Sequence, residues 1–242
     1  MTEPLSIDFR SIDYEAVLAA SYRSFLQPGD TVFDIGAHDG PHAVQFLDAV
    51  GATGRVVCFE PLPDVMETLR RRIAGAANVS LHQLALGAAP VASTSFVRAQ
   101  GSLAESGLRQ RVYNDPGAVT PQSIAVEVST IDLVAAGERI GALAYIKMDI
   151  EGGELDALAG GADTIRRFRP MISVEWGHRA YGAYGHREDS LFDFAAGQGY
   201  RIHDPFLRDI GDRPSWDRCK ARYCWDYFLV PNERVGEVVA RA

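Results

Sequence analysis

The chain alternates short apolar runs rich in β-branched residues with longer stretches whose apolar positions recur at helical spacing. This alternation is typical of a parallel sheet that is covered by helices on both faces. The apolar runs predict strands at residues 31–35, 55–60, 79–84, 144–150 and 170–176. The amphipathic stretches predict helices at residues 14–26, 41–50, 63–73, 154–167 and 191–198.

Two segments depart from this rhythm. Residues 91–128 carry Ser, Gly and Pro between strand-like ends at 95–98 and 124–128, which predicts a hairpin-like insertion with a surface loop at its tip. Such loops commonly contact substrates. A tight tract precedes the final run at 223–230, so we expect that last strand to be antiparallel. The predicted fold is therefore α/β, a doubly wound and mostly parallel sheet with an antiparallel last strand.

The predicted domain organisation follows from a single turn. Gln27-Pro28-Gly29-Asp30 places Pro and Gly where a turn needs them and separates the opening amphipathic stretch from the first strand. The sequence contains no internal repeat and no low-complexity linker. We therefore expect an N-terminal helical extension over residues 1–28 and one domain over 29–242, with the insertion at about 91–128.

Charge and hydropathy narrow the class of partners. A formal charge of −8 argues against nucleic-acid binding, which needs a basic face, and against adsorption to an anionic membrane. No apolar run approaches the ~20 residues that span a bilayer, so no membrane insertion is expected. The acidic opening residues lack an export signal, which favours a cytoplasmic location. The opening helix could cover an active site or form a homodimer contact.

A glycine-containing loop follows the first predicted strand, in the run Val32-Phe33-Asp34-Ile35-Gly36-Ala37-His38-Asp39-Gly40. Gly36 would let the backbone approach a ligand closely. The run fails the G-x-G-x-x-G pattern of nicotinamide sites, because Asp34 and Asp39 replace the first and third glycines. A carboxylate at Asp34 would repel a pyrophosphate and would suit a ligand that carries an ammonium or sulfonium charge. A helix-capping role is the alternative for Asp34.

An acidic residue also ends the second predicted strand, in Phe59-Glu60-Pro61. A carboxylate at this place can accept both hydrogen bonds of a ribose diol. Together, Asp34 and Glu60 favour a ligand site at this edge of the sheet over a purely structural role.

A second cluster of charges surrounds the exit of the fourth parallel strand, in Tyr145-Ile146-Lys147-Met148-Asp149-Ile150-Glu151-Gly152-Gly153-Glu154. Asp149 would lie beside the ligand site. Lys147 lies within an apolar strand and is expected to pair with a carboxylate, because an unpaired buried ammonium is costly. An acid-rich helix N-terminus is the alternative, and it explains Glu154 better than Asp149.

With these motifs, the sequence resembles the FkbM family of S-adenosylmethionine-dependent methyltransferases over roughly residues 30–176. The run Lys147-x-Asp149-x-Glu151-Gly152, followed by Glu154, is the most specific part of the likeness. The resemblance implies a Rossmann-like class I methyltransferase fold. It also implies O-methylation of a small-molecule hydroxyl, on a sugar or a glycosylated natural product.

The same resemblance assigns roles to single residues. Asp34 and Gly36 would hold the methionine end of S-adenosylmethionine, Glu60 the ribose, and Asp149 would face the reacting end. His38 stands where the family commonly has Asn, which should alter the hydrogen bonds of the loop without abolishing binding. The predicted cofactor-binding residues are Asp34, Gly36, Ala37, His38, Gly40, Glu60, Pro61, Ala85, Leu86 and Asp149.

Methyl transfer is an in-line displacement in which the protein mainly supplies alignment. An alcohol acceptor must also lose its proton, and a positioned base helps. His178, just past the strand that ends at Trp176, is the first candidate, because imidazole titrates near neutral pH. Asp149 and Glu175 are the other candidate catalytic residues, and a merely solvated loop histidine is the alternative for His178.

A metal-assisted mechanism is a further hypothesis. Asp149, Glu175 and His178, with Glu151 nearby, could converge on Mg²⁺, which prefers oxygen ligands and could lower the pKa of an acceptor hydroxyl. Pairing of these acids with Lys147 or arginines is the alternative. A methyltransferase with an N acceptor and a catalytically inactive S-adenosylmethionine-binding protein also stay open, whereas the missing glycines disfavour a nicotinamide-dependent oxidoreductase.

Overall fold

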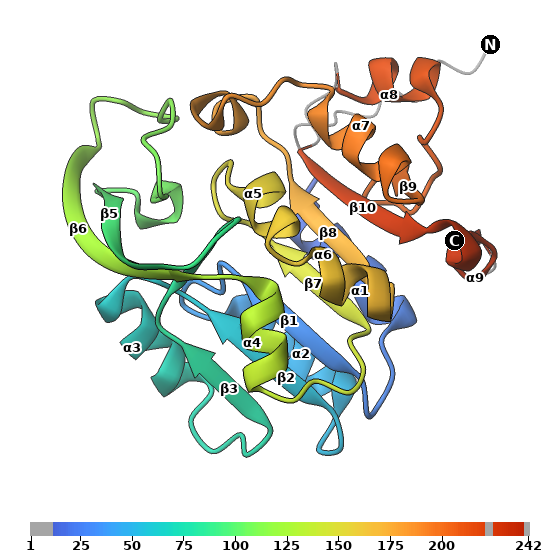
Figure 1. Cartoon of the computed structure of the whole chain (residues 1–242), viewed down its shortest axis with the longest axis horizontal. Coiled ribbons are helices and arrows are strands. Elements are labelled where there is room, and N and C mark those ends of the chain that lie inside the picture. Colours follow the sequence, from blue (N-terminus) through green and yellow to red (C-terminus); the bar gives the residue numbers. More distant parts are fainter. Residues whose placement is uncertain (1–11, 221–224, 240–242) are drawn as a thin grey trace, which may run out of the picture.

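A seven-stranded sheet runs through the molecule in the order β3-β2-β1-β7-β8-β10-β9 (Figure 1). The computed structural model describes residues 12–220 and 225–239. The strands of this sheet are β1 (Thr31–Ile35), β2 (Arg55–Phe59), β3 (Val79–His82), β7 (Tyr145–Met148), β8 (Met171–Glu175), β9 (Tyr200–His203) and β10 (Asp226–Pro231). β10 is antiparallel to both of its neighbours, whereas β3, β2, β1, β7 and β8 pair in parallel. The predicted fold class is confirmed.

The strand order reverses between β1 and β7. From β1 the chain builds outward through β2 and β3, and it then returns to place β7 on the other side of β1. Ile35 at the end of β1 is paired in register with Met148 at the end of β7. Ligands of open α/β sheets bind at the carboxyl ends of strands where the order reverses, so the loops after Ile35 and Met148 are the expected location of the site.

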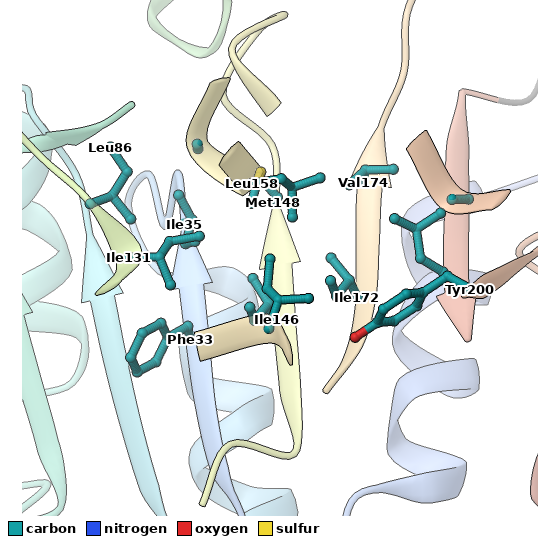
Figure 2. Close-up of a cluster of buried hydrophobic side chains, with 14 of the residues drawn as sticks. Phe33, Ile35, Leu86, Ile131, Ile146, Met148, Leu158, Ile172, Val174 and Tyr200 are labelled. Carbon is teal, nitrogen blue, oxygen red and sulfur yellow. The ribbon is translucent and has the colours of Figure 1, made fainter. Parts of the chain in front are cut away.

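Helices pack on both faces of the sheet, because alternate strand residues point to opposite sides. The apolar side chains of Val32 and Tyr145 pack on one face, and those of Phe33 and Ile146 pack on the other. The first face is covered by α1 (Tyr14–Phe25), α2 (Pro41–Val50), α3 (Pro63–Arg72) and α9 (Val235–Val239). The second is covered by α4 (Ile131–Gly137), α5 (Glu154–Ala159), α6 (Ala162–Phe168), α7 (Ser190–Gly197) and α8 (Arg213–Lys220). Figure 2 shows this second face, with Phe33, Ile146 and Ile172 on neighbouring strands.

A hairpin extends from the main sheet, as the strand-like ends of the 91–128 segment predict. β5 (Val91–Gln100) and β6 (Thr120–Ser129) pair antiparallel, and β4 (Ala85–Leu86) joins β6 to complete a three-stranded sheet. The hairpin arches away from the main sheet above α3 (Figure 1). Phe96 and Val126 of the hairpin pack against Leu62 and Val65 at the start of α3. The hairpin therefore rises over the carboxyl end of β2.

One predicted helix is divided. The sequence predicts a single helix over 154–167, but α5 ends at Ala159 and α6 begins at Ala162. Gly160 and Gly161 lie between the two helices, and both glycines are close to other segments of the chain. A Cβ at Gly160 would lie 2.1 Å from the carbonyl oxygen of Gly87. A Cβ at Gly161 would lie 2.8 Å from the Cβ of Ile131, so neither glycine leaves room for a side chain. The single-helix prediction is therefore wrong.

Other differences concern short elements. The sequence pattern does not predict α4, α8 or β4, nor the short 3₁₀ helices η2 (Leu103–Glu105), η3 (Tyr181–Tyr184) and η4 (Asn232–Arg234). Residues 1–11 of the predicted extension and residues 223–224 of the predicted last strand lie outside the described residues. Within residues 12–220 and 225–239, no helix combines the length and apolarity that a bilayer span requires.

Candidate active site

The loop after β1 is pressed against the exit of β7 at Gly36. The amides of Gly36 and Ala37 both donate to the carbonyl oxygen of Phe59, at 3.0 Å each, so the loop is also tied to β2. Gly36 has a φ of 79°, and a Cβ at this position would lie 1.9 Å from the carbonyl oxygen of Asp149. Only glycine fits here. This close approach brings the exits of β1, β2 and β7 together at one edge of the sheet.

A cavity of about 670 Å³ opens at this edge. The volume lies in the range of small-molecule and cofactor sites. The residues that line it come from β4, from the ends of β1, β2 and β7 and the segments beside them, from the hairpin and its loop, and from η3: Ile35, Gly36, His38, Phe59, Glu60, Pro61, Leu62, Leu84, Ala85, Leu86, Phe96, Leu103, Ala104, Ser106, Leu108, Asp149, Ile150, Glu151, Gly153 and Tyr184.

The structure brings most of the predicted cofactor residues together in this wall. They are Gly36, His38, Glu60, Pro61, Ala85, Leu86 and Asp149. Ala37 lines a second, adjoining cavity. Neither cavity is lined by Asp34, which lies beneath the loop, or by Gly40, which caps α2 in a left-handed conformation. The predicted direct contact between Asp34 and a ligand is therefore not formed. The carboxyl group of Asp34 can act on a ligand only electrostatically, from beneath the loop.

Glu60 is held rigidly in the cavity wall. Its Oε1 accepts a hydrogen bond from the amide of Leu62 at 2.8 Å, and its Oε2 accepts one from the amide of His38 at 3.2 Å. Burial raises the pKa of Glu60 to about 7, and these two hydrogen bonds oppose the rise only in part. In its ionised form Glu60 can accept the two hydrogen bonds of a vicinal diol.

Lys147 is paired, as the sequence predicts. Its Nζ lies 3.3 Å from Oδ2 of Asp149, and its side chain is only 5% exposed. Burial opposes ionisation of Lys147, but the carboxylates of Asp149, Asp34 and Glu15 raise its pKa above the usual value. The ammonium is therefore charged and lies among an excess of carboxyl groups.

Asp34 contributes to that excess from within the sheet. Its residue is 0% exposed, and within the described residues neither of its carboxyl oxygens has a hydrogen-bond partner. Burial raises the pKa of Asp34, whereas the nearby Lys147 and His42 lower it. The several acids that surround one lysine leave this edge of the sheet acidic, which suits a positively charged ligand.

Asp149 and Glu175 share a hydrogen bond at the exits of β7 and β8. Burial and the charge of Asp149 raise the pKa of Glu175 well above its usual range. Burial opposes ionisation of Asp149 too, but Lys147 and the hydrogen bond from Glu175 lower its pKa. These shifts favour the proton on Glu175, which then donates a hydrogen bond to the ionised Asp149.

The predicted metal ligands are only partly brought together. Asp149, Glu151 and Glu175 each place a carboxylate oxygen within 4.8 Å of the others. However, Glu151 is ion-paired with Arg111, and Asp149 is paired with Lys147. The alternative explanation given by the sequence, pairing of these acids with cations, accounts for both carboxylates.

His178 lies elsewhere. The amide of Trp176 donates to the carbonyl oxygen of Trp225 at 2.6 Å, which carries the chain after β8 alongside the start of β10. The His178 ring then packs edge-on against Trp225, at 5.7 Å between ring centroids, in a separate cavity of about 270 Å³. The structure thus does not join His178 to Asp149 and Glu175, and its position does not favour the role of base or metal ligand.

A second cavity, of about 920 Å³, adjoins the first at Gly36, His38, Ala104 and Asp149. Its remaining lining comes largely from α1 and α2 and includes Asp13, Glu15, Ala16, Ala37, Pro41, His42, Gln45 and Lys147. Sequence reasoning did not single out Glu15 or His42, because nothing in the spacing of two helices reveals which of their polar faces meet.

The segment 34–202 matches the family model for the methyltransferase FkbM domain, and this segment contains both loops of the site. The chain belongs to the FkbM methyltransferase family. The matched segment of this FkbM protein is accordingly an S-adenosylmethionine-dependent methyltransferase domain. No curated protein sequence matches the chain.

Three solved structures are similar to the FkbM protein, and the first of them shares its fold. A proposed rRNA-methylase from Clostridium thermocellum superposes with a TM-score of 0.50 at 12% identity, over 93% of this chain and 96% of that chain. An FkbM methyltransferase from Methylobacillus flagellatus KT superposes with a TM-score of 0.49 at 22% identity. The match covers 85% of this chain but only 47% of that chain. Aeropyrum pernix fibrillarin, solved with natively bound S-adenosyl-L-methionine, gives 0.45 at 16% identity, over 90% and 76% of the two chains. The predicted family and enzyme class are confirmed, whereas the roles of single residues stay predictions.

Proposed function

We propose that this methyltransferase transfers the methyl group of S-adenosylmethionine to a hydroxyl of a small molecule, a sugar or a glycosylated natural product. The observation that carries the proposal is the meeting of two cavities at Gly36 and Asp149. One is suited to a nucleoside, and the other is lined by groups that bind hydroxyls. A formal charge of −8 supports a small acceptor over a nucleic acid.

The first cavity fits S-adenosylmethionine. Glu60 would accept hydrogen bonds from the ribose diol, and Ala85 and Leu86 would flank the adenine. The methionine end would then extend past Gly36 toward Asp149. The unpartnered carboxyl of Asp34 and the surplus of acids around Lys147 would favour the ammonium and sulfonium charges. The bound cofactor supplies an electrophilic methyl group on sulfur.

The second cavity supports a neutral, hydroxylated acceptor. Asp13, Glu15 and Gln45 offer oxygen acceptors for hydroxyl protons, and His38 offers the ring nitrogen Nε2. The one lysine in the wall, Lys147, is already paired with Asp149. An anionic acceptor would therefore meet carboxylates without a free cation among the described residues that line this cavity.

Two finer points stay proposals. An amine acceptor would also suit carboxylates, so N-methylation is the competing acceptor class. Because Arg111 and Lys147 already balance the charges of Glu151 and Asp149, the side chains of this cluster need no Mg²⁺ to explain their arrangement.

Calorimetric titration with S-adenosylmethionine, with and without Mg²⁺ and with NADH in its place, tests the cofactor. Release of S-adenosylhomocysteine with methyl glycosides of hexoses and deoxyhexoses then tests the acceptor, and a methyl glycoside of an amino sugar serves as the competing class. Methylation of a sugar hydroxyl supports the proposal. Transfer to the amino sugar nitrogen alone, or binding of NADH instead of the methyl donor, overturns it.

A further inference from the structure

Three side chains form a continuous hydrogen-bonded chain between α1 and α2. The hydroxyl of Tyr22 lies 3.0 Å from Nδ1 of His42, and Nε2 of His42 lies 2.8 Å from Oε2 of Glu15. Tyr22 is 0% exposed and His42 is 8% exposed, whereas the Glu15 side chain is 67% exposed. These hydrogen bonds thus link the core beneath α1 to the surface of the second cavity.

The direction of these hydrogen bonds follows from the chemistry of the three groups. Burial raises the pKa of the Tyr22 hydroxyl above its usual value, so the hydroxyl keeps its proton. In the neutral imidazole, Tyr22 then donates to Nδ1, and Nε2–H donates to the carboxylate of Glu15. Tyr22 thereby fixes which ring nitrogen carries the proton, and His42 fixes the orientation of Glu15.

The charges around this chain keep Glu15 ionised. The hydrogen bond from His42 is the largest cause that lowers the pKa of Glu15, and burial opposes it. Lys147 on β7 lowers it further, whereas Asp149 acts in the opposite sense. His42 itself is faced by Tyr22 and Glu15 from α1 and by Asp34 from β1. Glu15 is therefore a carboxylate at neutral pH, positioned and able to receive a proton.

Glu15 also lies on the side of the site from which an acceptor must approach. Glu15 and His42 line the same cavity as Gly36 and Asp149, where the methionine end of the cofactor would lie. The first cavity, which would hold the adenosine, is lined on the hairpin side by Phe96 and Leu103. The reacting methyl group would thus be reached from the cavity that Glu15 lines.

We infer that Glu15 is the general base that takes the proton from the acceptor hydroxyl, and that His42 and Tyr22 are positioning residues for it. The inference rests on the proposed function. The acceptor oxygen forms a bond to the methyl carbon while the S–CH₃ bond breaks, and that electron pair stays on sulfur to give neutral S-adenosylhomocysteine. The hydroxyl proton passes to Glu15, which releases it to solvent through the open cavity.

The role of Glu15 as the base is tested by measuring kcat and kcat/KM with a methyl glycoside that the wild type methylates. Glu15→Gln should lower kcat by about 100-fold or more, in the range of a lost general base, without change in S-adenosylmethionine affinity. His42→Asn should move the acid limb of the kcat/KM profile to higher pH, because Glu15 loses the hydrogen bond that lowers its pKa. Tyr22→Phe should shift it in the same direction by less. Asp48→Asn is the matched control, because Asp48 joins Arg23 of α1 to α2 outside the cavity.

A second readout does not need turnover. In the complex with S-adenosylhomocysteine, the Nε2–H of His42 should give a protected NMR resonance that Glu15→Gln alters and Asp48→Asn does not. Full activity of Glu15→Gln beside an active wild type overturns the assignment of the base and leaves the proposed function intact. A wild type that binds S-adenosylmethionine but methylates none of the glycosides overturns the proposed function, and the base with it.

Discussion

The guanidinium of Arg111, in the loop of the hairpin, is ion-paired with the carboxylate of Glu151 at the exit of β7, and the two side chains are 3% and 8% exposed. Glu105, in the same loop, places a carboxylate oxygen 3.9 Å from Nε of Arg111. Glu151 adopts a left-handed backbone with a φ of 61°, which turns the chain sharply after Asp149. This buried pair attaches the loop of the hairpin to the strand exit that carries the site, and so holds one wall of the first cavity.

Removing Arg111 should destabilise the protein strongly. Arg111→Met would leave Glu151 and Glu105 buried without their cation, and the loss of one partner from a buried pair costs about 3–5 kcal/mol. Urea denaturation measures the free energy of unfolding. The exposed pair Arg166–Asp163 is the control, because Asp163→Asn should cost less than about 1 kcal/mol. Equal effects of the two substitutions would contradict the structural role of Arg111.

Gly36→Ala should damage the site far more than Gly75→Ala. Both glycines have positive φ, at 79° and 96°, so both substitutions carry the strain of a left-handed alanine, about 1–2 kcal/mol. A Cβ at Gly75 meets no atom within 4 Å, whereas one at Gly36 would overlap the carbonyl oxygen of Asp149. We expect Gly36→Ala alone to lose S-adenosylmethionine binding, as measured by calorimetry. If both variants bind equally well, the close approach of the two loops is not needed.

S-adenosylmethionine should bind more tightly as the pH rises through the pKa of Glu60, which burial raises to about 7. The ribose diol needs an ionised acceptor, so binding below this pH must release a proton and affinity falls there. Glu60→Gln should weaken binding by about tenfold or more, since a hydrogen bond to a charged group contributes ~1.5–3 kcal/mol, and should flatten the pH dependence. Calorimetry at about pH 6 and about pH 8 tests this linkage. A pH-independent wild-type affinity would sink the ribose assignment.

Folding stability should fall as Glu154 ionises. Its Oε1 accepts hydrogen bonds from the amides of Ile150 and Gly152 at 3.1 Å each, but burial raises its pKa to about 7. Because the folded state keeps this proton longer than the unfolded state, the stabilisation is full below about pH 4.5 and is lost as the pH rises through about 7. Glu154→Gln should remove about 3 kcal/mol of that decline. Denaturation across this range checks it, and parallel curves for both proteins would refute it.

The strands, the long helices and the glycine loop could be predicted because local pattern determines them. The run from Thr31 to Ile35 is apolar enough to be buried on both faces, and the Pro at residue 41 begins a helix. Gly36, Glu60 and Asp149 each follow directly from a strand end, so their convergence follows from the parallel sheet. The ion pair of Lys147 could be predicted from the sequence, because the burial of a lone ammonium is costly.

What the sequence could not reveal depends on contacts between distant segments. The Gly160-Gly161 dipeptide is a local signal for the division of the 154–167 helix, whereas the close approach of Gly160 to Gly87 is a contact between distant segments. His178 follows a strand in the manner of a site residue, but the hydrogen bond from Trp176 to Trp225 directs it away. Glu15 and His42 come from two helices whose relative rotation is set by apolar packing, with Tyr22 and Phe46 at the contact.

The position of α1 has a consequence for how such enzymes diverge. The family match begins at residue 34, after α1, yet Glu15 and Asp13 of this segment line the second cavity. Leu18, Tyr22 and Phe25 anchor the helix on the sheet through its apolar side. The residues on its outward side can therefore be substituted, or the whole helix exchanged between family members, without changing a residue that lines the cofactor cavity. Chimeras joined at the turn of residues 27–30 would be a direct way to transplant acceptor preference.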